Sequence, residues 1–282
     1  MLTPMNIDLI SIPTDTHQLD GLLYTPEINP NSRNVAQLFH GNTMNFYTGC
    51  SKFLPPELIS MGIASLAYNR RGHDILAIRN SRDVEGGALQ LTSEAIADNT
   101  YAREWLLEKG YSAPICIGHS NGGVLATKHA ASYQDTPALI LLSAHIGGTK
   151  MLPIASSKGL FGANQFPEII DIAKKMIAEG QEDKIIQMPG WYWITTPRSL
   201  LDLAKNLPDL IEEASKINCP VLFIRGEKEP EDLYPAEAFK SECNAPVDIV
   251  IIEQSDHFYV GFEDLVIKVI CNWLKNNKIM GT

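Results

Sequence analysis

The chain has 282 residues, of which 45% are hydrophobic and 20% charged, a composition typical of a folded protein with a large core. Its formal net charge of −10 argues against nucleic acid or an anionic membrane surface as a partner. The sequence has no run of about 18 uninterrupted apolar residues, so it predicts no membrane span.

The cysteines are odd in number, scattered, and without a Cys-x-x-Cys pair, a pattern typical of free thiols in a reducing compartment. Residues 1–8 contain neither a basic segment nor a long apolar one, so we expect no signal peptide. Together the two observations predict a cytoplasmic location. The five cysteines are Cys50, Cys116, Cys219, Cys243 and Cys271.

The N-terminal part of the chain predicts short strands around one helix. Residues 6–13 and 18–25 are apolar or alternate in polarity, which indicates an opening hairpin. Residues 34–39 and 63–68 are short apolar runs of the kind that form buried strands. Between these two runs we expect a helix over residues 51–61, with two prolines near its start.

Strands and helices continue to alternate through the middle of the chain. Residues 75–90 favour an irregular loop, whereas residues 91–109 have helical periodicity and are followed by a glycine. A strand is expected over residues 115–118, a helix over 124–131, and a buried strand over 138–142. Such alternation indicates a parallel sheet with helices on both faces.

The alternation stops over residues 146–198, where the sequence predicts helical segments and no clear strand. We therefore expect a helical cap, inserted at 146–198 above the carboxyl ends of the strands. The core domain would then consist of residues 1–145 and 199–282. In its second part we expect a helix over 199–216, strands at 221–224 and 247–252, and helices over 235–242 and 262–275.

A Gly-x-Ser-x-Gly motif, Gly118-His119-Ser120-Asn121-Gly122, lies where a predicted strand turns into a helix. Small residues are needed two positions before and after the serine, because a Cβ there would strike the adjoining strand or helix. The free N–H groups that begin the helix can hold a developing negative charge. The motif therefore predicts a nucleophilic serine beside an oxyanion site, provided that an acid and a base follow.

Further motifs follow the ends of predicted strands: His40-Gly41-Asn42, Arg71-Gly72-His73, the loop after residues 221–224, and Asp256-His257. With the elbow at Ser120, these motifs make the chain similar to the α/β-hydrolase superfamily, specifically to serine hydrolases related to serine aminopeptidases and monoglyceride lipases. The resemblance covers nearly the whole chain and is weakest in residues 146–198. It implies an α/β-hydrolase fold with a mostly parallel eight-stranded sheet, helices on both faces and an inserted helical cap.

The resemblance also implies roles for particular residues. Ser120 would be the nucleophile, and His257, which follows the last predicted strand, would be the base that activates it. The backbone N–H groups of Asn42 and Asn121 would form the oxyanion hole, with the N–H of Thr43 as the alternative to that of Asn42.

The carboxylate that orients His257 is left open between two residues of one loop. Relatives usually carry Gly-x-x-Asp after this strand, and the matching position after Gly226 is Glu229, which we favour. Asp232 is the alternative, because aspartate is the residue type that the family prefers. In addition, Pro235 resembles the proline that often follows the acid.

We predict a serine hydrolase that cleaves an acyl bond through an acyl-enzyme, with a carboxylic ester of a small or medium hydrophobic substrate as the favoured target. The expected partner is a small-molecule acyl substrate, and no metal ion or organic cofactor is implied. Relatives of this fold also cleave thioesters, amides, peptides and carbon–carbon bonds, so these reactions are alternatives. A non-catalytic ligand-binding protein that retains the fold is an alternative from a different class.

Aromatic side chains of the predicted cap are candidates for contact with substrate. We expect Phe161, Trp191 and Trp193 to line the pocket and to set the choice of substrate. The alternative is that these aromatic side chains form a small core of the cap and do not touch the substrate.

Overall fold

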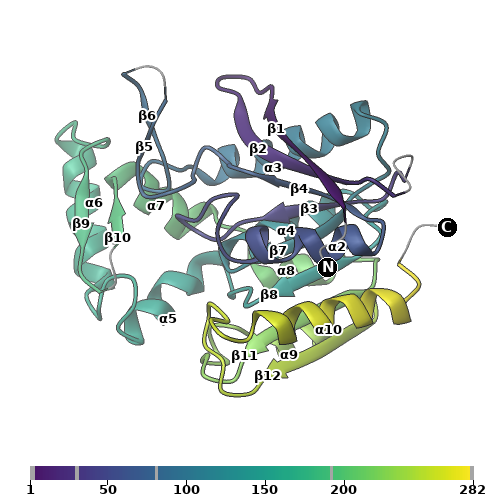
Figure 1. Cartoon of the computed structure of the whole chain (residues 1–282). Helices are drawn as coiled ribbons and strands as arrows, with labels where there is room; N and C mark the ends of the chain where they lie inside the picture. Colours follow the sequence, from purple (N-terminus) through teal and green to yellow (C-terminus); the bar gives the residue numbers. More distant parts are fainter. Residues whose placement is uncertain (1–3, 29–31, 80–81, 191–192, 280–282) are drawn as a thin grey trace.

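A computed structural model describes residues 4–28, 32–79, 82–190 and 193–279. At its centre is an eight-stranded sheet with the strand order β1-β2-β4-β3-β7-β8-β11-β12 (Figure 1). The strands are β1 (Met5–Ile12), β2 (Leu19–Pro26), β3 (Val35–Phe39), β4 (Ala64–Tyr68), β7 (Ile115–His119), β8 (Leu139–Leu142), β11 (Val221–Gly226) and β12 (Val247–Ile252).

The sheet is mostly parallel. The pairs β1–β2 and β2–β4 are antiparallel, and every pair from β4 to β12 in the strand order is parallel. The predicted opening hairpin and mostly parallel eight-stranded sheet are therefore confirmed. Because these strands are parallel, the loops that follow them all lie at the same side of the sheet, where the carboxyl ends of the strands are.

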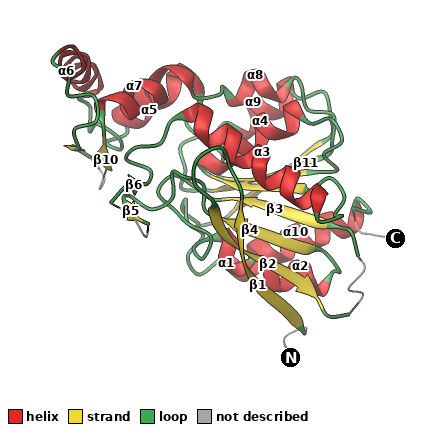
Figure 2. Cartoon of the chain, turned by 90° about the horizontal axis from the view of Figure 1, so that it is seen from above, coloured by secondary structure: helices red, strands yellow, loops and turns green. Residues whose placement is uncertain are grey.

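Helices cover both faces of the sheet, as predicted (Figure 2). Successive side chains of a strand point to opposite faces. In β8, Leu139 and Leu141 join the core beneath one set of helices, and Ile140 and Leu142 join the core beneath the other. One face carries α1 (Cys50–Phe53), α2 (Pro55–Ser60) and α10 (Glu263–Asn276), and the other carries α3 (Thr92–Glu108), α4 (Asn121–Ser132), α8 (Leu210–Ala214) and α9 (Ala236–Glu242).

Two predicted helices are each divided in two. The helix expected over 51–61 is interrupted at Leu54, because Pro55 has no backbone N–H to continue the ladder of hydrogen bonds. The helix expected over 199–216 is divided into α7 (Pro197–Asn206) and α8. Between them, Leu207 precedes a proline and is extended, with φ −58° and ψ 132°.

The segment expected to be a helical cap contains helices and also one small sheet. Its helices are the 3₁₀ helix η1 (Gly148–Lys150), α5 (Met151–Ser157) and α6 (Phe166–Ala178). The expectation of no strand is wrong, since β9 (Ile186–Met188) pairs antiparallel with β10 (Trp193–Thr195). Strands of three residues are too short to show a periodic pattern in the sequence.

The elements of this segment and α7 lie together at one end of the central sheet (Figure 1). They share an apolar cluster that includes Met151, Ile169, Trp193 and Leu200. Beside them, the loop predicted over 75–90 forms a short hairpin of β5 (Ala77–Ile78) and β6 (Val84–Glu85). Residues 146–198 are therefore held by an apolar cluster that they share with α7.

All five cysteines are free thiols, in agreement with the prediction. Within the described part of the chain, no helix is both long and apolar enough to cross a lipid bilayer.

Candidate active site

Ser120 lies at a sharp turn between β7 and α4, with φ +57° and ψ −124°. The glycines on either side make this turn sterically possible. A Cβ on Gly118 would lie 2.4 Å from the carbonyl oxygen of Gly122. A Cβ on Gly122 would lie 2.1 Å from the carbonyl oxygen of Phe39. The backbone therefore holds the serine side chain at the carboxyl end of β7. Its φ lies in a region that non-glycine residues rarely adopt.

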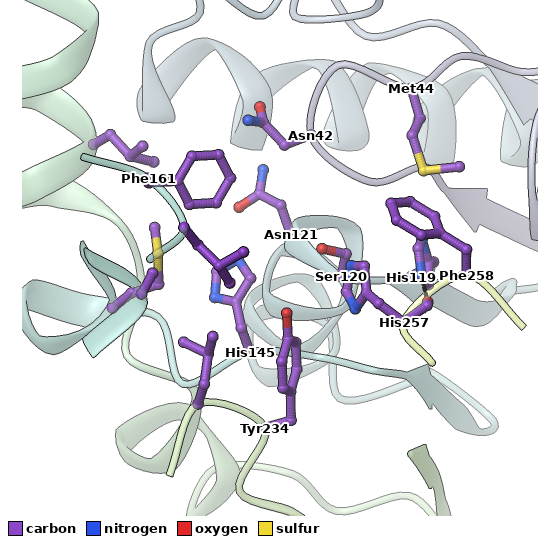
Figure 3. A pocket seen from close by; sticks show the side chains of 15 residues that line it. Asn42, Met44, His119, Ser120, Asn121, His145, Phe161, Tyr234, His257 and Phe258 are labelled. Atoms are coloured by element: carbon purple, nitrogen blue, oxygen red, sulfur yellow. Dashed lines mark hydrogen bonds between the residues drawn. The ribbon is translucent and has the colours of Figure 1, made fainter. Parts of the chain in front are cut away.

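His257 follows β12 and lines the same cavity as Ser120 (Figure 3). Its Nδ1 lies 2.7 Å from Oε1 of Glu229, so a proton on Nδ1 is directed at the carboxylate. His119 supports it from below: Nε2 of His119 donates a hydrogen bond of 2.8 Å to the carbonyl oxygen of His257. Burial, followed by the charge of His257, lowers the pKa of His119 to about 3, which keeps this ring neutral.

Glu229 is buried, with 5% of its surface exposed, and both of its oxygens are engaged. While Oε1 faces His257, Oε2 accepts hydrogen bonds from Ser143 Oγ at 2.6 Å and from the N–H of Gly226 at 2.7 Å. The alternative acid, Asp232, lies elsewhere: its carboxylate is half exposed and pairs with Lys158 Nζ at 2.9 Å. Of the two carboxylates, only Glu229 contacts His257.

Two hydroxyl groups that no sequence motif indicated support this carboxylate, that of Ser143 directly and that of Tyr259 through Ser143. Ser143 follows β8 at φ +48°, and its Oγ lies 2.5 Å from the hydroxyl of Tyr259. Burial and the charge of Glu229 raise the pKa of Tyr259 well above its usual value, so the phenol stays protonated. The loop after β8 contains no carboxylate, so looking only for acidic residues after the strands does not find it. A search for any polar side chain following a strand finds Ser143.

The two predicted oxyanion donors, Asn42 and Asn121, both line the cavity (Figure 3). Asn121 is the first residue of α4, where backbone N–H groups have no acceptor within the helix. Asn42 follows β3 in a loop that buried polar contacts hold in place. Arg70 donates from its backbone N–H to His40 Nε2 at 3.1 Å, and from Nη2 to the carbonyl oxygen of His40 at 2.7 Å.

The cavity has a volume of about 220 Å³ and lies between the carboxyl ends of the strands and residues 146–198. Phe161 is one of the residues that line it. Trp193 lies behind Phe161, with ring centroids 4.9 Å apart at an angle of 72°, and is not one of the lining residues of the described chain. Trp191 lies outside the described residues. The apolar part of the wall comprises Met44, Met151, Ala155, Leu160, Phe161, Leu203, Leu233 and Phe258.

No three or more histidine, cysteine, aspartate or glutamate side chains are arranged to hold a metal ion in the ranges that the structure describes. The polar groups around Ser120 are instead an imidazole, a carboxylate that contacts it, and the first N–H groups of a helix. This combination is able to activate a hydroxyl group and to stabilise an oxyanion.

Comparisons with solved structures agree with this architecture. Est1E from Butyrivibrio proteoclasticus, with ferulic acid bound, superposes with a TM-score of 0.74 at 18% identity, over 96% of this chain and 99% of that one. A soluble variant of monoglyceride lipase from Saccharomyces cerevisiae, in complex with a substrate analogue, has a TM-score of 0.73 at 14% identity, over 100% and 98%. The esterase domain of a Rhodothermus marinus protein has a TM-score of 0.64 at 17% identity, over 96% and 99%.

A search of curated protein sequences finds no significant match. The family model of the serine aminopeptidases, S33, by contrast, matches residues 30–231. The matched range contains Ser120 and Glu229, and it ends before His257, which the structure brings to the same site. The chain therefore belongs to the serine aminopeptidase S33 family and has the α/β-hydrolase fold.

Proposed function

We propose that this protein is a serine hydrolase that cleaves a carboxylic ester with a small or medium hydrophobic acyl group. One observation carries the proposal. Ser120, at the elbow, lines the same cavity as His257, and Nδ1 of His257 lies 2.7 Å from a buried carboxylate of Glu229. A nucleophile, a base and a residue that orients the base are the minimum set for acyl transfer through a serine ester.

In the first half of the reaction, Ser120 Oγ attacks the carbonyl carbon of the ester and gives up its proton to Nε2 of His257. The Nδ1–H of the resulting imidazolium remains directed at Glu229, which stabilises the positive charge. The backbone N–H groups of Asn42 and Asn121 hold the oxyanion of the tetrahedral intermediate. When the intermediate collapses, the proton passes from His257 to the departing alkoxide, and an acyl group stays on Ser120.

In the second half, water takes the place of the alcohol. His257 removes a proton from the water as it attacks the acyl carbon, and the same two N–H groups hold the second oxyanion. Collapse of this intermediate returns the proton to Ser120 and releases the carboxylic acid. Every proton transfer in the cycle passes through His257, so no metal ion or organic cofactor is used.

The cavity supports an acyl group of limited size. A cavity of about 150 Å³ lined by apolar residues holds benzene, so the 220 Å³ found here would accept roughly six to nine carbon atoms. In the proposal, residues 146–198 act as a cap over this cavity, and residues 1–145 and 199–282 form the catalytic core. Phe161 would contact the acyl chain directly, and Trp193 would act by holding Phe161 in place.

Two structural neighbours support an ester as the substrate. The structure of Est1E contains ferulic acid, a carboxylic acid, and the structure of monoglyceride lipase contains a substrate analogue. At such low sequence identity the similarity extends to the fold and not to the individual substrate. The proposal therefore takes from these neighbours only the class of reaction.

A panel of p-nitrophenyl esters, acyl thioesters and aminoacyl anilides, tested against the wild type and Ser120→Ala, examines the proposal. We expect turnover of the esters, with the highest kcat/KM for acyl chains of medium length, and loss of that turnover in the variant. Preferential turnover of thioesters or anilides would change the substrate class while keeping Ser120 as the nucleophile. Tight binding of ligands without any turnover would instead favour a binding protein.

A further inference from the structure

The side chain of Asn121 is a buried amide that the catalytic scheme does not use. Only 3% of the surface of Asn121 is exposed, and neither Oδ1 nor Nδ2 has a hydrogen-bond partner among the described residues. The residue lines the cavity (Figure 3), and its backbone N–H, the proposed oxyanion donor, is a separate group. A buried amide with no partner is unfavourable, which points to a ligand that supplies the partners.

A second polar group, His145, lines the same cavity. The N–H of Gly147 donates to Nδ1 of His145 at 3.2 Å, so the proton of the neutral ring lies on Nε2. Burial, followed by the charge of His257, lowers the pKa of His145 to about 3, so the ring stays neutral. His145 is 7% exposed and therefore presents an N–H donor in surroundings from which water is largely excluded.

The fold places these two residues after the ends of two adjacent strands, β7 and β8. Asn121 begins the helix after β7, and His145 lies in the loop after the adjacent parallel strand β8. The N–H of Ser120 donates to the carbonyl oxygen of Leu142 at 2.9 Å, which joins the ends of the two strands. The N–H of Ile146 donates to the carbonyl oxygen of Leu233 at 2.8 Å and fixes the loop that carries His145.

The two side chains lie on the acyl side of the site. His257 must protonate the leaving alcohol, so the alcohol lies toward His257 and the acyl group extends away from it. In Figure 3, Ser120 lies between His257 on one side and Asn121 and His145 on the other. Phe161, which belongs to the apolar part of the wall, lies beyond them.

We propose that Asn121 and His145 form a polar subsite that recognises a hydroxyl group on the acyl chain of the substrate. The proposal rests on the ester hydrolysis proposed above and names the substrate class as esters of hydroxylated acids. A hydroxyl group is both a donor and an acceptor, and so it satisfies Asn121 Oδ1 while accepting from Asn121 Nδ2 or His145 Nε2. A keto group only accepts, and it would leave Oδ1 of the amide unpaired. Because Asn121 directly follows the nucleophile, the hydroxyl lies within a few bonds of the scissile carbonyl.

The test compares p-nitrophenyl hexanoate with p-nitrophenyl 2-hydroxyhexanoate and 3-hydroxyhexanoate, each corrected for its spontaneous hydrolysis. We expect at least one hydroxylated ester to have a kcat/KM about 10-fold or more above that of the plain ester in the wild type. The ratio of hydroxylated to plain ester should fall toward one in Asn121→Leu. If Asn121→Leu does not fold, Asn121→Ala takes its place, and the same fall is expected. The ratio should also fall in His145→Phe. Because the ratio is taken within each variant, a general loss of activity cancels.

Phe161→Leu serves as the matched control, since it changes the apolar part of the same cavity. It should alter the preference for chain length and keep the hydroxyl ratio. A ratio near one in the wild type, or a ratio unchanged in both Asn121 variants, overturns the subsite and leaves the ester hydrolase proposal intact.

A binding measurement separates failure of the subsite from failure of the proposed reaction. Calorimetric titration of Ser120→Ala with hexanoate and with 3-hydroxyhexanoate and 2-hydroxyhexanoate needs no turnover. Tighter binding of a hydroxylated acid, lost in Ser120→Ala/Asn121→Leu, supports the subsite even if the wild type hydrolyses none of the esters. Equal binding of all three acids overturns it.

Discussion

Oε1 of Glu229 lies 2.7 Å from Nδ1 of His257, while Oε2 of the same carboxylate accepts hydrogen bonds from Ser143 and Gly226. The carboxylate cannot rotate without breaking the contacts on its second oxygen. The imidazole is consequently held in one orientation and in the tautomer that leaves Nε2 free to accept a proton. Glutamate is longer than the aspartate usual in relatives. The hydrogen bonds from Ser143 and Gly226 fix the carboxylate of this longer side chain where it contacts His257.

Replacing Ser120 by alanine should reduce kcat by about 10³-fold or more while leaving the fold unchanged, because the covalent route is lost and the oxyanion donors remain. Circular dichroism and ester turnover measure the two effects. A fluorophosphonate probe should label the wild type once per chain, at Ser120 as located by peptide mass spectrometry. Labelling at another residue, or full activity of the variant, would sink the assignment of the nucleophile.

Glu229→Gln and Asp232→Asn form a matched pair, since each replaces a carboxylate of the same loop by its amide. We expect the Glu229 variant to lose about 10⁴-fold in kcat, because the amide can leave the imidazole in the wrong tautomer. The Asp232 variant should keep its activity and lose at most about 1 kcal/mol of stability, since the ion pair with Lys158 is exposed. The opposite pattern of kcat values would make Asp232 the acid.

Ser143→Ala removes a donor to the carboxylate without touching the cavity wall. We expect kcat to fall about 10-fold with KM unchanged, and the free energy of unfolding to fall by about 1–3 kcal/mol, because Oε2 is left with one partner. Tyr259→Phe removes the hydroxyl group that contacts Ser143 Oγ and should have a smaller effect in the same direction. A rise in KM with unchanged kcat in Ser143→Ala would contradict a role in positioning Glu229.

Phe161 and Trp193 should respond differently to truncation. Phe161→Ala enlarges the cavity, so we expect kcat/KM to shift toward esters with longer acyl chains. Trp193→Ala empties a buried position behind Phe161 and should cost about 3–5 kcal/mol of stability, with a smaller shift of chain-length preference. Kinetics across a series of chain lengths and urea unfolding measure both. An unchanged chain-length preference in a folded Phe161→Ala protein would argue that this ring does not contact the acyl group.

Buried histidines should make the protein sensitive to acid. Burial, followed by the charge of Arg103, lowers the pKa of His129 to about 3, whereas an unfolded histidine has a pKa of about 6.5. Between these values the unfolded chain binds the additional proton, so stability is lost as the pH falls from about 6.5 toward 3. The loss is at most about 1.4 kcal/mol per pH unit for each such histidine.

His129→Phe tests this prediction away from the proposed catalytic residues, because His129 packs against Phe39 and Tyr133. Urea unfolding at pH 7, 6 and 5 should show a weaker dependence on pH in this variant than in the wild type. His17→Gln is the control: His17 is exposed, and its replacement should leave the dependence unchanged. An equal pH dependence in all three proteins would mean that His129 has the same pKa in the folded and unfolded states.

The amino-acid sequence by itself determines the features that depend on local geometry. The elbow at Ser120 follows from the glycines two positions away, since any larger residue would collide with backbone at 2.1–2.4 Å. The strands are recognisable because a buried strand needs a short, continuous apolar run, and because those runs alternate with helical segments. The spacing from Gly226 to Glu229 is also local, which is why counting along one loop finds the carboxylate that contacts His257.

Only the tertiary structure decides which distant groups meet. Ser143 and Tyr259 are 116 residues apart, and their hydroxyl groups meet because β8 and the loop after β12 end at the same edge of the sheet. Trp193 and Phe161 are both apolar aromatic residues in the sequence, and packing alone places one behind the other. No local pattern contains this information, because each contact depends on how whole elements stack. For the same reason, the unpartnered amide of Asn121 is visible only once the chain is folded.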